Sequence, residues 1–452
     1  MEPLAAGSPS RQAWLAVAVA GFTTTAALGT RGAFGVLLVP VAEAFGWPRG
    51  LVAGAIAVNA LLWAASAAPW GVLLDRRGPR WAFGLAAALA AAGLLVAAHT
   101  TAPWELYLGM GVLVGIGLAP LQVNSQGVVV AHWFARRRGV ALGIVAAGAG
   151  LGVLTFAPLT QAVLDAAGWR AAFGVLAAVF LVAVLPLNAL AQRRAPSPAP
   201  MAAPLAREAR EHALARRPLA TRLPPAPSRA AGPTVRLALR HPRFWLLAAG
   251  YLVGAVPVAL LLAHGVACLL DAGFAPSVAA GAFGLSGGCA VVAMLGLGWL
   301  ADRCSGEWAY TMGSAAIVLG CAVLLAAAPG REGLVVLYAL LFAVGWASRQ
   351  GLHAFMGAAI GQGRSLGALM GLLAAHIAAG SALGPALGGW AFDATGSYRL
   401  ALLLGAACAA VATGCIWLAA PRRGVLVAAL PPPAPSTGCH RATSRPDAVG
   451  EH

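Results

Sequence analysis

Residues 71–80, GVLLDRRGPR, lie between two apolar stretches and have a near copy later in the chain. The copy, GWLADRCSGEW, occupies residues 298–308, and its aspartate follows that of the first stretch by 227 positions. A second pair of landmarks, DAAGWRAAF from Asp165 and DATGSYRLAL from Asp393, recurs with an offset of 228. Because two unrelated landmarks share almost one offset, the sequence indicates a duplicated unit.

The overall composition is that of a membrane protein. Hydrophobic residues make up 60% of the 452 positions and charged residues 10%, whereas a soluble domain carries about a quarter charged residues. Long Ala-, Leu- and Gly-rich runs without ten-residue alternation favour helices over strands. Since a span needs about 20 mostly apolar residues, the sequence predicts an all-α membrane protein with twelve transmembrane helices in two pseudo-symmetric six-helix bundles. The predicted spans are 13–39, 50–73, 81–98, 104–130, 139–163, 171–190, 243–269, 277–300, 309–328, 333–356, 366–391 and 400–419.

These spans divide the chain into five parts. The segment between the bundles is rich in Pro and Arg, which predicts a flexible linker, and the C-terminal tail has a similar composition. The first span is too long for a signal-peptide core and lacks an A-x-A exit, so it is expected to be retained. The predicted parts are a cytoplasmic tail (1–12), the N-terminal bundle (13–190), the linker (191–241), the C-terminal bundle (242–420) and a disordered tail (421–452).

The distribution of arginines among the predicted loops indicates which side of the membrane each loop faces. All 30 basic residues are Arg. With the N-terminus placed inside, 24 of them fall in inner loops, linker and tails, four fall in outer loops and two lie within spans. Cytoplasmic loops carry an excess of basic residues, so both termini and the linker are predicted to be cytoplasmic, in an inner membrane of bacterial type. The same distribution favours contact with anionic lipid and argues against a nucleic-acid partner.

The repeated loop also carries a family resemblance. GVLLDRRGPR resembles the G-x-x-x-D-R-x-G-x-R signature that follows the second helix in the major facilitator superfamily, and GIVAAGAGLGVLTFAPL in the fifth span is similar to its Gly-rich motif. Three further stretches resemble the branch of monocarboxylate porters and oxalate/formate antiporters: AFGVLLVPVAEAFGWPR (33–49), WFARRRGVALGIVAAGAGLG (133–152) and LGALMGLLAAHIAAGSALGPALGGWAFDATGSYRLAL (366–402). The resemblance implies a transporter. The chain departs from that branch at 277–300, which holds no charged residue where its members often carry a charged pair.

Two arginines inside spans are the main candidates for a substrate site. Arg31 lies in the first span and Arg349 in the tenth, and the resemblance places helices one, four, seven and ten around a central cavity. The repeat aligns Arg349 and His353 with Gln122 and Gln126 in the fourth span, each pair on one helical face. No Asp or Glu lies mid-span, so the unpaired guanidinium groups predict an anionic, carboxylate-bearing substrate. The alternative is that either Arg snorkels or binds helix-end carbonyls.

Three histidines within spans are candidates for proton coupling, because a His titrates near neutral pH. A lone His among apolar residues is more often structural, and the sequence leaves exchange against a counter-anion or facilitated flux open. The predicted substrate-binding set is Arg31, Gln122, Gln126, His264, Arg349, His353 and His376.

The duplicated loops are predicted to form an inner gate. Asp75, Arg76 and Arg80 would form ion pairs that shift as the two halves rock, and Asp302 with Arg303 would be a reduced second copy; the alternative is a turn with a helix cap. Small residues and prolines in the fifth and eleventh spans are predicted to allow close packing and bending of those helices. They are Gly148, Gly150, Gly152, Pro158, Gly380, Gly384, Pro385 and Gly388.

Two other classes of function compete with carboxylate transport. One is an exporter of drugs or other metabolites on the same fold, although cation exporters usually need an acidic residue in the cavity. The other is a membrane enzyme or a transporter-like sensor, but the chain has no HExxH or P-loop motif and no CxxC pair among its seven cysteines. The sequence therefore predicts no catalytic residue, cofactor or metal. It predicts a monomer whose partners are an anionic small molecule, lipid and, for coupling, protons or a counter-anion.

Overall fold

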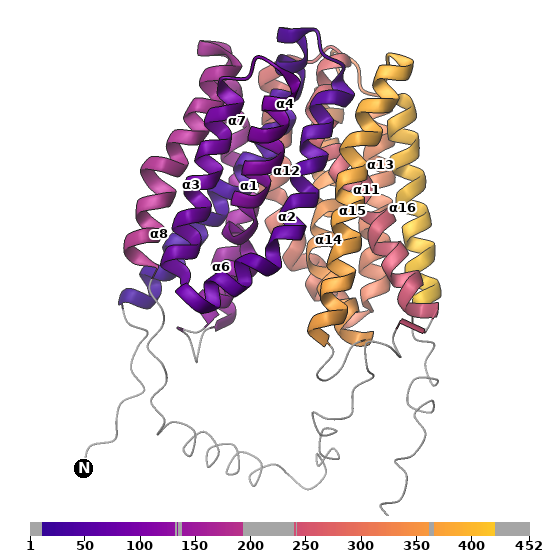
Figure 1. The fold of residues 1–452 in the computed structure, drawn as a ribbon. Coiled ribbons are helices and arrows are strands. Elements are labelled where there is room, and N and C mark those ends of the chain that lie inside the picture. The colour runs from indigo at the N-terminus through magenta and orange to yellow at the C-terminus, as the bar shows by residue number, and fades with distance from the viewer. Residues whose placement is uncertain are drawn as a thin grey trace, which may run out of the picture.

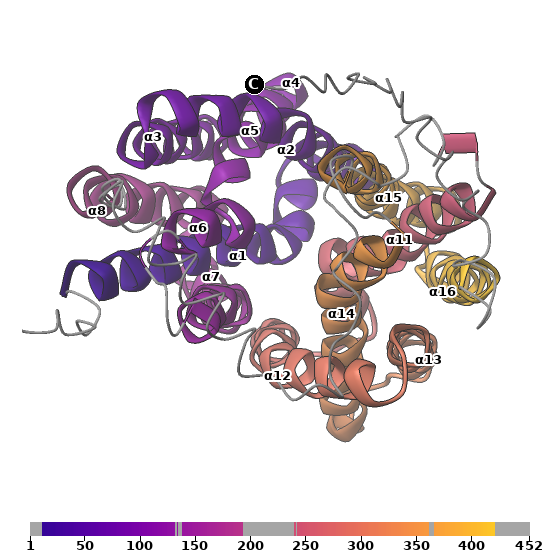
Figure 2. The ribbon, with the colours of Figure 1, turned by 90° about the horizontal axis from the view of Figure 1, so that it is seen from below.

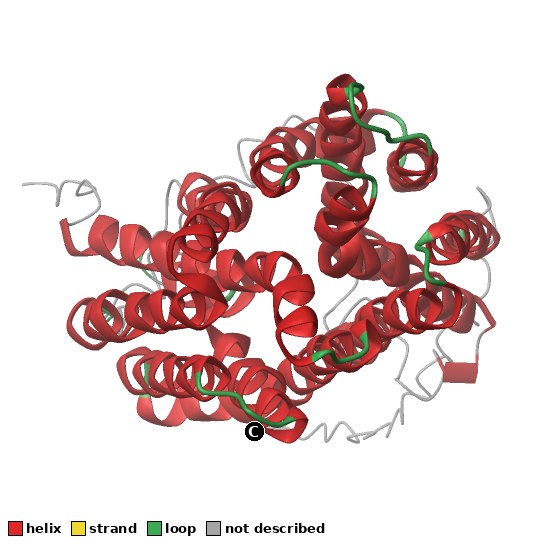
Figure 3. Cartoon of the chain, turned by 90° about the horizontal axis from the view of Figure 1, so that it is seen from above, coloured by secondary structure: helices red, strands yellow, loops and turns green. Residues whose placement is uncertain are grey.

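The computed structural model describes residues 11–131, 133, 138–192, 239–240, 242–360 and 366–420. Within these ranges the chain is helical and contains no strand (Figure 3). Eleven helices are long and apolar enough to cross a membrane, as expected where backbone groups must bond within their own segment. The elements of the N-terminal half are α1 (Arg11–Phe45), α2 (Arg49–Arg77), α3 (Pro79–Ala98), α4 (Pro103–Leu106), the π-helix η1 (Tyr107–Leu113), α5 (Val114–Leu118), the 3-10 helix η2 (Ala119–Leu121), α6 (Val123–Ala131), α7 (Arg138–Ala178), the π-helix η3 (Val179–Val184) and α8 (Leu185–Ala191).

The C-terminal half has longer, less interrupted helices. They form a second group beside the first, as Figure 2 shows. The chain ends of both halves lie at one end of the molecule, where α1 and α11 begin and α8 and α16 end (Figure 1). We call this the linker end and the opposite one the far end. The helices are α11 (Pro242–Asp271), α12 (Pro276–Arg303), α13 (Gly306–Leu325), α14 (Glu332–Ile360), α15 (Leu366–Thr395) and α16 (Arg399–Ala419).

The predicted division into two six-span bundles is confirmed by this arrangement. One of the eleven apolar segments, Val140–Ala191, is 52 residues long and covers two predicted spans. It turns at Gly168, whose φ of 81° and ψ of 174° are not helical. The matching landmark of the repeat has Gly396, with φ of 67°. A positive φ is accessible to glycine at little cost, so both copies of the repeat reverse direction at a glycine with positive φ.

The fourth span, predicted over 104–130, is present but is not one regular helix. It is divided among α4, η1, α5, η2 and α6. Pro120 lies in the short 3-10 turn, and the next residue but one, Gln122, is extended with φ of −97° and ψ of 170°. Proline lacks the N–H that continues a helix, which explains the break. The apolar pattern runs through this proline unchanged, so the sequence predicted the span, which the structure places at Pro103–Val130, but not the break within it.

Close helix pairs hold each half together. α1 packs on α7 and α11 packs on α15. A Cβ at Gly148 would lie 2.6 Å from the carbonyl oxygen of Gly21, and one at Gly152 would lie 2.7 Å from the amide nitrogen of Gly29. Membrane helices associate through such small residues, because lipid provides no hydrophobic drive between them.

The remaining residues of the predicted packing set lie at similar approaches. Gly150 contacts α12 at Gly287, and Pro158 lies inside α7 beside Gly284 of α12. Gly380 and Gly384 contact the backbone of α11, and Gly388 lies against the His264 ring. Pro385 lies inside α15.

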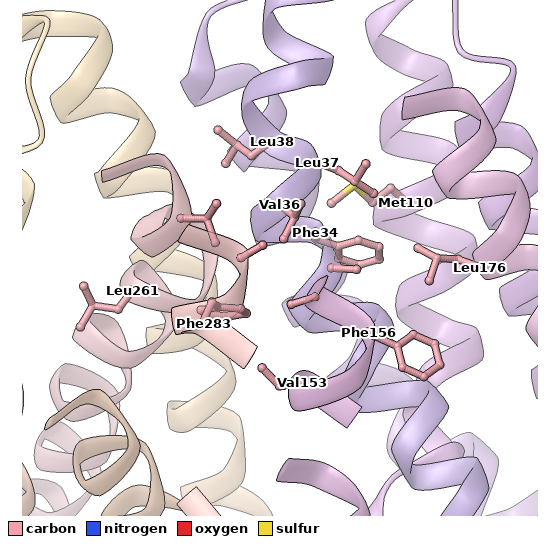
Figure 4. Packing of buried hydrophobic residues seen from close by; sticks show 14 of the residues in the cluster. Phe34, Val36, Leu37, Leu38, Met110, Val153, Phe156, Leu176, Leu261 and Phe283 are labelled. Carbon is pink, nitrogen blue, oxygen red and sulfur yellow. The ribbon is translucent and has the colours of Figure 1, made fainter. Parts of the chain in front are cut away.

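The two halves meet along three helix pairs, α2 with α15, α7 with α12, and α1 with α11. One buried apolar cluster, which includes Phe34 and Leu261, runs across this boundary, and Figure 4 shows Val153 of the first half beside Phe283 of the second. Burial falls toward the linker end. From Val52 to Ala60 five residues of α2 are buried, whereas from there to its end only Trp70 is. The halves are therefore packed at the far end and separate toward the linker end.

Gly152→Val should destabilise the protein, because its side chain would collide with the backbone of α1. Overpacking of this kind costs about 1–3 kcal/mol, so the midpoint of thermal unfolding in detergent should fall by several degrees. Gly143→Val is the matched control, since a Cβ there meets nothing within 4 Å and Gly143 lies on the same helix. Equal midpoints for both variants would contradict the glycine-mediated contact between α1 and α7.

Candidate functional site

Arg31 is a cation in the middle of the N-terminal half. Its guanidinium carbon lies 5.1 Å from the ring centroid of Trp63 on α2, a cation–π distance. Both residues lie 14 positions from the far ends of their helices, a depth of about 21 Å at 1.5 Å per residue. Arg31 is half-buried, and among the described residues it forms no hydrogen bond or ion pair. The Trp63 face thus holds the group in place while its N–H donors stay free.

The break in the fourth span places polar amides beside α1 and α2. The turn η2, which precedes Gln122, contacts both of these helices. The Gln122 Nε2 atom is buried without a hydrogen-bond partner in the described part of the chain. Gln126 is fully buried, and its Oε1 accepts from the Nε2 of Gln192 at 3.0 Å. Broken helices with exposed polar groups are a recurrent feature of transporter binding sites.

Arg349 has a different environment from Arg31. It is 5% exposed, and its donors are directed at groups of the C-terminal half. Nη1 donates to the Ser348 hydroxyl at 2.8 Å, Nη2 to the Ser314 hydroxyl at 2.9 Å and Nε to the Gly254 carbonyl at 3.4 Å. Its guanidinium carbon lies 4.5 Å from the Tyr310 ring centroid. These contacts join α11, α13 and α14, and the substrate role of Arg349 stays a prediction.

The three histidines of the predicted set lie apart from one another. His264 is fully buried near the far end, where its ring nitrogens bind the Tyr398 hydroxyl and the Pro385 carbonyl. His376 is half-exposed on α15, with Nδ1 2.8 Å from the Leu372 carbonyl oxygen. His353 lies on α14, and its side chain falls outside the described residues.

The predicted inner gate lies at the linker end. Asp75 and Arg76 are exposed in the last turn of α2, and Arg80 is exposed in the first turn of α3. Gly78, with φ of 87°, makes the turn between these helices.

In the second copy, Arg303 of α12 lies 4.3 Å from the Trp299 ring centroid. The side chain of Asp302 lies outside the described residues. The gating role of both copies stays a prediction.

At the far end a polar cluster was missed from the sequence. Arg49 of the N-terminal half binds Asp271 of the C-terminal half, and its neighbours include Asp393 and Tyr398. The sequence signal was the presence of charges at predicted helix ends. It became a site only when the two halves were brought together, since these residues are over 200 positions apart.

Comparison with known proteins places the chain among transporters. A family model described as the Major Facilitator Superfamily matches residues 14–361. Two solved structures share the fold: the nucleoside transporter NupG (TM-score 0.69, 12% identity, 91% of this chain and 100% of that one) and a bacterial homologue of the human lysosomal transporter Spinster (TM-score 0.67, 15% identity, 91% and 98%).

Curated relatives are similar over shorter segments. Monocarboxylate transporter 13 of Bos taurus is 28% identical over 168 residues, 37% of this chain and 39% of the relative. Monocarboxylate transporter 11 of Mus musculus is 40% identical over 100 residues, 22% of each protein. The chain therefore aligns with less than half the length of these relatives.

Arg349→Ala should lower the unfolding midpoint by several degrees, because Ser314, Ser348 and the Gly254 carbonyl lose their donor. Each buried polar group left without a partner costs about 1–3 kcal/mol. Arg331→Ala, in an exposed turn, is the control and should leave the midpoint unchanged. An unchanged midpoint in Arg349→Ala together with lost transport would instead support the substrate role predicted from the sequence.

Proposed function

Because the chain belongs to the Major Facilitator Superfamily, we propose that it carries a small organic anion, a mono- or dicarboxylate, across a membrane by alternating access. The environment of Arg31 carries this proposal. A charge at mid-membrane depth costs about 2.5–3.5 kcal/mol on insertion scales, and no carboxylate in the described residues pairs with this one. A substrate that brings its own negative charge supplies the missing partner.

The chemistry around Arg31 suits a carboxylate with a short hydrocarbon part. A guanidinium presents its N–H groups as a planar fork that matches two carboxylate oxygens. Stacking on the face of Trp63 fixes the plane of that fork and adds an apolar wall beside it. The unpartnered Gln122 amide provides a further donor from the third element that contacts α1 and α2.

The similarity to monocarboxylate transporters supports the same substrate class. Residues 277–300 of α12 carry no charge, so the proposed anion receptor of this chain is on α1 instead. Protons or a counter-anion would balance the substrate charge, and the transport measurement below separates these two modes.

We place the linker end in the cytoplasm and the far end outside an inner membrane of bacterial type. The bias of arginines toward the linker end supports this orientation. The packing then corresponds to a molecule closed toward the outside, with its halves apart toward the cytoplasm.

Arg31→Gln should strongly weaken saturable carboxylate uptake, because a neutral amide cannot replace a bidentate guanidinium. Hydrogen bonds to charged groups contribute about 1.5–3 kcal/mol each, so substrate affinity should fall by about tenfold to a hundredfold. Uptake is measured in proteoliposomes with labelled formate, lactate, pyruvate, oxalate and malonate and one cationic drug, with and without internal unlabelled anion. Stimulation by the internal anion indicates exchange, and stimulation by a proton gradient indicates proton coupling.

Arg331→Gln is the control for this experiment and should transport as the parent protein does. A second readout is independent of flux: a bound carboxylate should raise the unfolding midpoint of the parent but not of Arg31→Gln, since ligand at 100 times its Kd stabilises by about 2.7 kcal/mol. Uptake of the cation alone, or equal carboxylate uptake by the Arg31 variant, would overturn the anion-receptor proposal.

A further inference from the structure

At the far end of the molecule, a bidentate ion pair between Arg49 and Asp271 joins the two halves. Arg49 is the first residue of α2, and Asp271 is the last residue of α11. Nη1 of Arg49 lies 2.7 Å from Oδ2 of Asp271, and Nη2 lies 2.9 Å from Oδ1. The Arg49 side chain is 14% exposed, so water screens this pair less than an open surface pair. A bidentate contact of this kind joins the two halves in one fixed geometry.

A second carboxylate, that of Asp393, also joins the two halves of the protein. Asp393 of α15 accepts from the backbone N–H of Arg49 at 2.9 Å and from that of Gly50 at 2.7 Å. These N–H groups have no partner within α2, because they belong to its first turn, and the positive end of the helix dipole favours an anion there. A Cβ at Gly50 would lie 2.6 Å from the Asp393 Oδ2 atom. The N-terminus of α2 is therefore capped by the opposite half of the protein.

The contact extends inward from Arg49 to a buried histidine. Nη1 of Arg49 donates to the Tyr398 hydroxyl at 3.2 Å, and this hydroxyl lies 3.0 Å from Nδ1 of His264. Nε2 of His264 lies 2.9 Å from the Pro385 carbonyl oxygen. A carbonyl oxygen only accepts, so Nε2 carries the proton, and Nδ1 of the neutral ring accepts from Tyr398. These three hydrogen bonds are then all donated in the same direction: Arg49 donates to Tyr398, Tyr398 to His264, and His264 to the Pro385 carbonyl.

We propose that Arg49, Asp271, Asp393, Tyr398 and His264 form a far-end gate that holds the two halves closed, and that His264 positions Tyr398 within it. Opening at this end separates α2 from α11 and α15. Asp271 must then leave the Arg49 side chain, and Asp393 must leave the N–H groups at the start of α2, in the same movement. The proposal concerns the conformational equilibrium and does not depend on the identity of the substrate.

At the equivalent contact between the halves, that of α7 with α12, the described residues form no ion pair. There the repeat places Asp165 of α7 near the start of α12, in a pocket of about 400 Å³ that Pro276 also lines. Asp165 accepts from Gln161 of its own helix at 2.7 Å. Pro276 stands at the first position of α12, where α2 has Arg49, and has no N–H to donate, so the pair of N–H contacts that Asp393 makes on α2 cannot be repeated in full there. Among the described residues, the ion pair and the carboxylate cap between the halves therefore lie where α2 meets α11 and α15.

The test measures the distance across the far end in the full-length protein in lipid nanodiscs. Spin labels on unnatural amino acids at the exposed positions Thr101 and Arg331, one in each half, avoid the native cysteines. The parent should give mainly a short distance. Arg49→Gln should raise the ratio of long to short distances by about tenfold or more, because losing one partner strands Asp271. Asp271→Asn, which removes the charge of the other partner and keeps the size of its side chain, should raise the same ratio.

Arg170→Gln is the matched control. Arg170 is also a far-end arginine that stacks on Trp169, but its partners among the described residues, including the Phe45 ring and the Thr100 carbonyl, lie within one half. An unchanged distance in Arg49→Gln or in Asp271→Asn, or an equal change in Arg170→Gln, would overturn the gate.

His264 is tested with two replacements. Gln can donate to the Pro385 carbonyl and accept from Tyr398, whereas Ala can do neither. His264→Gln should therefore keep the short distance, and His264→Ala should shift the population toward the long one. Equal distances in the two variants would overturn the positioning role. The anion proposal can fail in the uptake experiment without changing any of these distance outcomes.

Discussion

The backbones of α11 and α15 approach so closely that a Cβ at Gly384 would lie 2.5 Å from the Val256 carbonyl oxygen. Much of the C-terminal half depends on this approach. It seats the His264 ring in the space left by Gly388 and brings the Pro385 carbonyl within hydrogen-bond distance of it. Close contact of small residues therefore does more than pack two helices in lipid, since it also fixes the polar chain that ends at Arg49.

The two arginines within spans show how similar sequence signals acquire different surroundings. Each lies in an apolar run without a nearby carboxylate in the sequence. Arg349 is provided with hydroxyl, carbonyl and aromatic partners by α11, α13 and α14, so its desolvation is offset within the fold. Among the described residues, Arg31 contacts the Trp63 ring and forms no hydrogen bond or ion pair. This contrast is what separates a cation that joins helices from one that is suited to receive a ligand.

The architecture was largely predictable from the sequence, because apolar length and the offset between landmarks depend on local composition. Twelve spans, two halves and the turns at Gly168 and Gly396 follow from these features. The break at Gln122 was missed, although Pro120 was its signal, since one proline does not alter the hydropathy of the span. The environment of Arg349 and the contacts of Arg49 were beyond sequence reasoning, because each depends on which helices become neighbours.

The single cap at α2 breaks the twofold relation that the repeat otherwise imposes. In an isologous interface between identical units every contact is made twice, and one substitution acts at both places. Here Asp393 meets two N–H groups at α2, whereas its counterpart Asp165 stands near a helix that begins with Pro276. The two copies of the repeat have thus diverged: Asp393 binds the start of α2, whereas the start of α12 has a proline in place of one donor. The strength of closure can consequently change at a single helix end, without any matching change in the other copy.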